Sequence, residues 1–103
     1  MPRPRKRRNC RRFDGDRVFK PRSIPMSELE VIRLGVDELE ALRLCDLEGQ
    51  EQESTGTRMG VSRGTVQRML KSGRAKVVRA LLDSSALVIE KGEIDEALHS
   101  DGE

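Results

Sequence analysis

The chain has 103 residues, of which 35% are hydrophobic and 37% are charged, and its formal net charge is +2. This length predicts one small domain, and the low apolar fraction predicts a modest core with part of the chain outside it. No apolar run reaches the roughly 20 residues that a membrane span needs, and the N-terminus lacks the apolar stretch of a signal peptide. We therefore expect a cytoplasmic protein with no membrane contact.

Positive and negative charges are segregated along the chain. Residues 1–22 hold ten Lys or Arg and two Asp, and residues 58–79 hold seven Lys or Arg and no acidic residue. The other two segments are acidic. Residues 23–57 hold nine acidic and two basic residues, and residues 80–103 hold seven acidic residues and one basic residue. A merely solvated surface would scatter both signs, whereas concentrated positive blocks in a nearly neutral chain indicate a polyanionic partner such as nucleic acid.

Residues 1–22 are predicted to form a flexible basic arm. Like charges repel one another, proline removes backbone donors, and the segment has no apolar periodicity. Phe13, Val18 and Phe19 are its sizeable apolar groups and could fix its far end to the core. Such an arm can enter the minor groove or follow phosphates, or it can act as an unspecific electrostatic anchor. The candidate contact residues are Arg3, Arg5, Lys6, Arg7, Arg8, Arg11 and Arg12.

Beyond the arm, the patterns predict a mainly α-helical domain over residues 23–94 and an acidic, disordered tail over 95–103. The expected elements are a strand at 29–34, a helix at 36–49, a short polar helix at 50–58, a long helix from Ser62 to about Asp83 and a second strand at 86–94. Two isolated strands are unstable, so we expect them to form a small two-stranded element, within one chain or between two. The apolar stripe of the long helix is Val66, Met69, Leu70, Gly73, Val77, Ala80 and Leu81.

The stretch "MGVSRGTVQRML", residues 59–70, has the spacing of a helix-turn-helix. Gly60 suits the tight turn between two crossing helices, and Gly56, four residues earlier, is the small residue that lets the second helix approach. Ser62 can cap the second helix by accepting hydrogen bonds from the following amides. The apolar residues that would hold the two helices together are Met59, Val61, Val66 and Met69.

In this geometry the start of the long helix would face a DNA groove. Recognition helices read bases with their N-terminal residues, and Arg and Gln suit bidentate contacts with guanine and adenine. The candidate base-reading residues are Ser62, Arg63, Gly64, Thr65, Gln67 and Arg68. Cations further along would meet phosphates, which position the protein without reading sequence. The candidate phosphate contacts are Arg58, Lys71, Arg74, Lys76 and Arg79.

Cysteine and histidine offer no metal chemistry. Cys10 and Cys45 have no close ligand partners, and His99 lies in the acidic tail, so we expect no metal and no cofactor. The cysteines are expected to be free thiols, Cys45 as a small apolar helix residue, with a disulfide between them as the less favoured alternative.

Several stretches, in order, resemble a known family: "MPRPRKRRNC", "FKP", "DELEALRL", "MGVSRGTVQR" and "ALVIEKG". They are similar to a prokaryotic family of predicted DNA-binding proteins, domain of unknown function 134, over about residues 1–94. The resemblance implies a helix-turn-helix similar to region four of sigma factors and a DNA-binding role. The chain departs after Glu53, where such proteins have a pair of alanines, which predicts a less stable first helix of the motif.

Three classes of function remain to be compared. The favoured one is a sequence-specific binder of double-stranded DNA, a transcriptional regulator associated with the nucleoid, with homodimer formation left open. The alternative is a less specific binder of DNA or structured RNA; single strands are disfavoured because stacking needs more aromatics than two phenylalanines. An enzyme such as a nuclease would need a positioned base or metal cluster, which the sequence lacks, so we expect no enzymatic activity.

Overall fold

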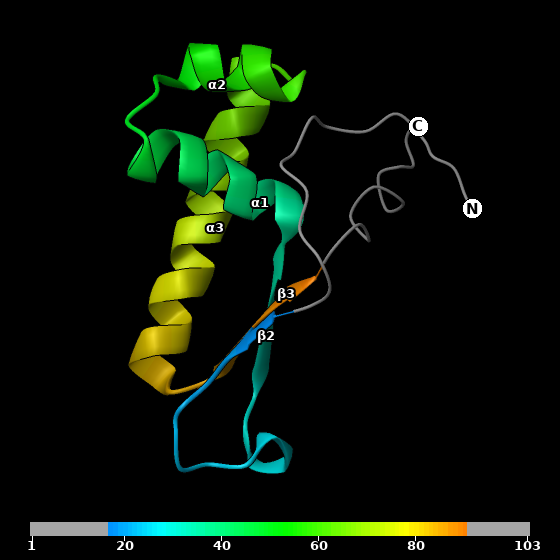
Figure 1. The fold of residues 1–103 in the computed structure, drawn as a ribbon, viewed down its shortest axis with the longest axis vertical. Helices are drawn as coiled ribbons and strands as arrows, with labels where there is room; N and C mark the ends of the chain where they lie inside the picture. The colour runs from blue at the N-terminus through cyan, green and yellow to red at the C-terminus, as the bar shows by residue number, and fades with distance from the viewer. Residues whose placement is uncertain (1–16, 91–103) are drawn as a thin grey trace, which may run out of the picture.

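The computed structural model describes residues 17–90. Its elements, in chain order, are β1 (Arg17–Phe19), a 3-10 turn η1 (Met26–Glu28), β2 (Val31–Gly35), α1 (Val36–Leu42), a π-helical segment η2 (Arg43–Leu47), α2 (Gln52–Met59), α3 (Arg63–Asp83) and β3 (Ala86–Glu90). Figure 1 shows α3 as the long axis of the molecule, with α1 crossing near its middle, α2 across its N-terminal end and the sheet beside its C-terminal half.

The sheet has the strand order β1-β3-β2. Strand β2 pairs with β3 in parallel, with Leu34 opposite Ile89, and β1 pairs with β3 in the antiparallel sense, with Val18 opposite Val88. A parallel pair needs a crossover connection, and the three helices supply it. The two strands predicted from sequence therefore do pair within one chain.

The predicted helix over residues 36–49 forms in two parts. It begins directly after β2, where the Gly35 N–H donates to Glu38 Oε1 at 2.8 Å. Acidic residues in a first turn suit the positive end of the helix dipole. From Arg43 the hydrogen bonds span five residues, as in Glu48 N–H to the Arg43 carbonyl at 2.9 Å. Gly49 follows with φ of +75°, which ends the helix.

The connection between α2 and α3 is short and closely hydrogen-bonded. Gly60 lies in the left-handed region with φ of 76° and ends α2, as glycine commonly does. The Val61 N–H donates to the Gly56 carbonyl at 2.9 Å. Ser62 then begins α3, its side-chain oxygen accepting from the Thr65 N–H. The predicted positions of turn glycine and helix cap are confirmed.

The core lies where α1, η2, α2 and α3 meet. Its fully or almost fully buried members are Ala41, Leu44, Met59, Val66, Met69 and Leu70. Cys45 packs against this cluster as the predicted apolar helix residue, and its Sγ lies 3.2 Å from the Thr55 hydroxyl oxygen. Thr55 is fully buried, so this contact gives its hydroxyl a partner inside the core. None of the helices within residues 17–90 is long and apolar enough to cross a membrane.

Two expectations need correction. The sheet has three strands rather than two, because residues 17–19, within the segment expected to be an arm, pair with β3. This strand is short and exposed, so it leaves no apolar periodicity in the sequence. The predicted burial of the apolar stripe of α3 is also wrong at its end. Leu81, expected in the core, is 76% exposed, because the sheet covers only one side of this end of the helix. The predicted tail, residues 95–103, and the end of the predicted second strand, residues 91–94, lie outside the described residues.

Candidate nucleic-acid interface

The predicted base-reading residues lie together at the start of α3. Arg63, Gln67 and Arg68 are exposed, and Gly64 and Thr65 are half-buried. The first turn of α3 contains no acidic residue, so no carboxylate of its own offsets the positive end of the helix dipole. This end of the helix can therefore accept an anion or the edge of a polar ligand. We call residues 62–68 the N-terminal face of α3.

A chain of hydrogen bonds orders this face. Ser62 Oγ accepts from the Thr65 N–H at 3.1 Å, which satisfies one of the amides left open at a helix start. The Thr65 hydroxyl oxygen in turn accepts from Arg68 Nη2 at 3.1 Å. The cap thus also orients an arginine that projects from the second turn of the helix.

Two of the predicted phosphate contacts are engaged within the protein. Arg74 donates to Asp46 through two nitrogens, Nε at 3.0 Å and Nη2 at 2.8 Å. This hydrogen bonding lowers the pKa of the Asp46 carboxyl below its usual value, despite the opposing effect of burial. The pair ties the middle of α3 to η2, yet the Arg74 side chain remains half-exposed.

Lys76 is held still more firmly. Its Nζ donates to both oxygens of Glu38, at 2.8 and 3.0 Å, and the Ser72 hydroxyl donates to the same carboxylate. Burial alone would raise the pKa of Glu38, but these hydrogen bonds and that from the Gly35 N–H outweigh it and hold the pKa below its ordinary value. Glu38 therefore joins β2, α1 and α3 at one point.

The remaining predicted phosphate contacts lie on the surface. Lys71 and Arg79 are exposed, and neither pairs with a carboxylate among residues 17–90. The Arg58 side chain is half-exposed and lies 3.8 Å from a Glu48 carboxylate oxygen. The predicted arm contacts, Arg3 to Arg12, lie outside the described residues.

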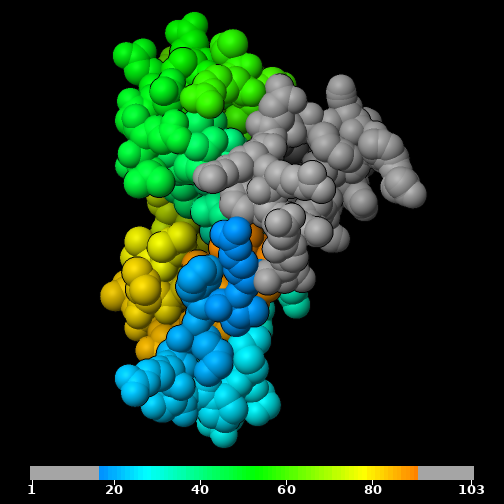
Figure 2. All heavy atoms as spheres, viewed as in Figure 1, coloured from blue at the N-terminus to red at the C-terminus, as the bar shows by residue number. Residues whose placement is uncertain are grey.

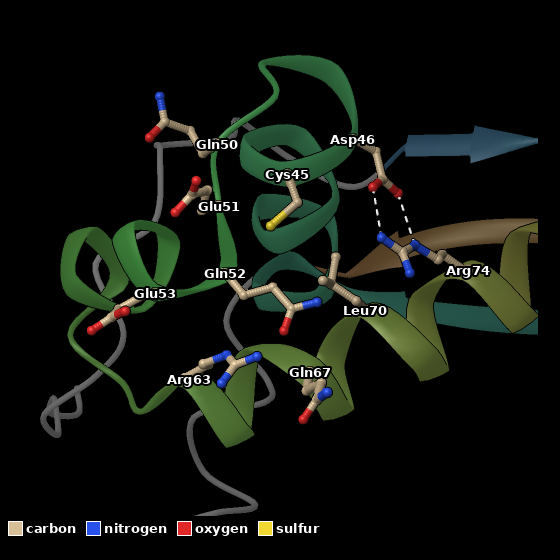
Figure 3. A pocket seen from close by; sticks show the side chains of 10 residues that line it. All are labelled: Cys45, Asp46, Gln50, Glu51, Gln52, Glu53, Arg63, Gln67, Leu70 and Arg74. Atoms are coloured by element: carbon tan, nitrogen blue, oxygen red, sulfur yellow. Dashed lines mark hydrogen bonds and ion pairs between the residues drawn. The ribbon is translucent and has the colours of Figure 1, made fainter.

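A hollow of about 500 Å³ adjoins the N-terminal face of α3 (Figure 3). Its floor includes Leu70, and its walls come from η2, the start of α2 and α3, with Gln52 directed toward Arg63 and Gln67 (Figure 3). The side-chain oxygen of Gln52 is buried and has no hydrogen-bond partner within the described residues. Gln52 therefore lines this hollow together with Arg63 and Gln67.

The sequence did not predict a place in this site for Gln52, Glu38 or Asp46. Gln52 is the first residue of α2, and its place beside α3 follows from the turn geometry, so the helix-turn-helix spacing contained a usable signal. The roles of Glu38 and Asp46 depend on partners 28 to 38 residues away in the chain, and no local pattern encodes them.

The fold and this surface define a small, mainly α-helical domain with a three-stranded sheet and a basic helix end. Residues 1–97 match the model of the family described as "Protein of unknown function DUF134". The chain belongs to this family. No solved structure matches it.

Relatives named "UPF0251 protein" come from several organisms. The chain is 52% identical over 92 residues to the protein of Pelotomaculum thermopropionicum, covering 89% of this chain and 70% of the relative. It is 49% identical to that of Moorella thermoacetica, covering 89% and 62%, and 49% identical over 83 residues to that of Methanosarcina acetivorans, covering 81% and 74%. The chain thus spans about two thirds of the length of these relatives.

Proposed function

We propose that the chain is a sequence-specific binder of double-stranded DNA that acts as a transcriptional regulator. In this proposal α2 and α3 form a helix-turn-helix similar to that of sigma region four. One observation carries it: a capped helix start that presents Arg63, Gln67 and Arg68 outward, with no acidic residue from Arg58 to Leu82. Arg and Gln have the paired hydrogen-bonding groups that base edges match.

The proposed contacts divide by position on α3. Arg63, Gln67 and Arg68 read bases in the major groove, and the absence of a side chain at Gly64 lets the backbone approach closely. Arg58, Lys71 and Arg79 contact phosphates on either side. Such contacts fix the register of a protein on the duplex, whereas only contacts to base edges carry sequence information.

Arg74 and Lys76 differ from these contacts because both form ion pairs within the protein. Their ion pairs with Asp46 and Glu38 hold α3 in place against η2 and α1. Arg74 is exposed enough to reach a phosphate while keeping one carboxylate contact. Lys76 would have to leave both oxygens of Glu38, so we rank it last among the phosphate contacts.

The proposed complex contains duplex DNA and protein and needs no metal, cofactor or catalytic step. Helix-turn-helix proteins commonly bind paired half-sites as dimers, and we propose the same arrangement here. A regulator of this kind would act at the nucleoid.

The two exposed arginines Arg68 and Arg79 on α3 make a matched test. Binding of each alanine variant to a preferred duplex and to random duplex is measured by fluorescence anisotropy at one salt concentration. Arg68→Ala should weaken binding to the preferred duplex by about 1–3 kcal/mol and affect random duplex less. Arg79→Ala should weaken both equally. If Arg68→Ala also weakens both equally, the protein is an unspecific binder.

A further inference from the structure

One face of α3 changes character halfway along the helix. At 100° per residue, residues spaced four and three apart form a single stripe, and here that stripe runs Gln67, Lys71, Arg74, Val78 and Leu81. Its N-terminal half is polar or basic and adjoins the N-terminal face of α3. Its C-terminal half is apolar and, with Leu82 beside it, faces away from the core.

The apolar half of this stripe is exposed. Val78 is 52% exposed, Leu81 76% and Leu82 78%, and Phe19 of β1, 56% exposed, lies across a shallow groove from Leu81. The groove holds about 340 Å³, and Val77, Ala80 and Leu87 contribute to its lining. Figure 2 shows this end of α3 (yellow to orange) at the surface next to the N-terminal strand (blue). Clustered exposed apolar side chains of this kind are a candidate interaction surface.

We propose that the patch formed by Phe19, Val78, Leu81 and Leu82 binds the same patch of a second copy of this chain, with the two α3 helices antiparallel about a twofold axis. A twofold contact uses one surface twice and closes, so no apolar patch is left over to continue a filament. The patch is apolar at its centre, and the rim carries charges of both signs, Arg79 and Asp83.

Charge decides the orientation of the two helices. In a parallel pair, Lys71 and Arg74 would face the same cations of the second copy along the shared stripe, which is repulsive. In an antiparallel pair centred near Ala80, the basic N-terminal half of each α3 extends beyond the C-terminal end of the other α3. The like charges then lie apart, and the N-terminal faces of both helices stay open to a ligand.

The size of the patch indicates a weak dimer. If a fully exposed leucine side chain contributes about 100 Å², the four side chains expose on the order of 300 Å² of apolar area. A standard interface buries about 800 Å² per partner, somewhat more than half of it apolar. The patch is smaller than this, so we expect dimer formation to depend on concentration in the micromolar range.

The spacing of the two helix starts can be compared with DNA, a point that rests on the proposed function. Thr65 and Ala80 are 15 residues apart, which is about 22 Å of helix. The two starts would then lie about 45 Å apart along the helix direction if the axes are parallel, and closer if the helices cross at an angle, which brings them toward the spacing of half-sites. One turn of duplex separates half-sites by about 34–36 Å.

The test measures the mass of the full chain by sedimentation equilibrium without DNA, so it is independent of any DNA binding. The wild type should shift from 11.6 kDa toward twice that mass as concentration rises. Leu82→Lys should weaken the dimer at least tenfold, and a cation near a helix C-terminus leaves the helix itself stable. The control is Leu47→Lys, at a leucine 79% exposed on η2, which should leave the dimer constant unchanged.

Crosslinking tests the orientation. In a background of Cys10→Ser and Cys45→Ala, Leu81→Cys should crosslink to itself through a short bis-maleimide. Lys71→Cys should not, because its two copies would lie on the order of 27 Å apart. A chain that stays monomeric at every concentration overturns the proposal. So does a dimer that Leu47→Lys dissociates and Leu82→Lys does not, or one that crosslinks at position 71 instead of 81.

Discussion

Gly56 and Val61 lie so close together that no side chain fits between them. A Cβ built on Gly56 would lie 2.7 Å from the backbone oxygen of Val61, and the Val61 N–H already donates to the Gly56 carbonyl. The obstacle is backbone, which cannot rotate away as a side chain can. This contact sets how closely the end of α2 approaches the start of α3, and it confirms the small residue that the sequence placed four positions before the turn.

Gly56→Ala should therefore destabilise the fold, although alanine is the better helix former. Forcing a methyl group into this contact should lower the free energy of unfolding by about 1–3 kcal/mol, measured by urea denaturation. The control is Gly64→Ala, because a Cβ there would lie 3.8 Å or more from its nearest neighbours. It should be neutral or stabilising by up to about 1 kcal/mol. Equal destabilisation by both changes would contradict the close approach at Gly56.

The cap at Ser62 can be separated from DNA binding by two substitutions. Ser62→Ala removes the acceptor for the Thr65 N–H and should lower the free energy of unfolding by about 1 kcal/mol. Ser62→Asp keeps the cap, so stability should remain near that of the wild type. Its negative charge should nevertheless weaken DNA binding at least tenfold, measured by anisotropy. Unchanged DNA binding by Ser62→Asp would place the ligand elsewhere.

Glu38 should make the stability of the protein depend on pH. Its folded-state pKa lies below the ordinary 4.5, so its contribution is present above that value and is lost as the pH falls through the lowered pKa. Glu38→Gln should lower the free energy of unfolding by about 1–3 kcal/mol at pH 7. The difference in the free energy of unfolding between this variant and the wild type should become smaller in acid. The control Glu28→Gln, at an exposed carboxylate, should leave the free energy of unfolding unchanged at both neutral and acid pH. A difference between Glu38→Gln and the wild type that stays the same at all pH values would argue against an ionised Glu38.

Lys71 and Lys76 differ in how their charge is used. Lys71 is exposed, whereas Lys76 is held by Glu38. Lys71→Ala should reduce the slope of log K against log salt concentration by about 0.9, because one fewer phosphate is neutralised. Lys76→Ala should leave that slope nearly unchanged and instead lower the thermal midpoint. The reverse pattern would show that Lys76 leaves Glu38 on binding.

Contact between the basic arm and DNA is tested by the same slope of log K against log salt concentration. Deleting residues 2–12 removes seven cations, and if they contact phosphates, the salt dependence of binding should flatten by several units. Affinity should fall most at low salt, where counterion release contributes most. A truncated chain with the slope of the full chain would show that the arm does not contact DNA.

Local patterns predicted much of this fold because they report local interactions. Ser62, Gly60 and the apolar spacing of Val66 and Met69 act within a few residues, so the turn, the cap and α3 could be placed from sequence. The pairing of β1 with β3 joins residues about 70 positions apart, and an exposed three-residue strand carries no periodic signal.

The candidate site divides in the same way. The exposed residues at the start of α3 followed from the helix register. The pairing of Lys76 with Glu38 did not, because a basic residue in a basic run looks identical whether a distant carboxylate or solvent faces it. The exposure of Leu81 was not predicted for a related reason. An apolar stripe on a helix does not show how far along that helix the neighbouring elements extend.

The most direct test of the proposed function is selection of bound sequences from a random pool of double-stranded DNA by the full chain. We predict one enriched motif, or two half-sites at fixed spacing, and loss of its most selective position when Gln67 or Arg68 is replaced by alanine. Retention of duplexes without any enriched sequence, unchanged by either substitution, would contradict sequence reading by α3.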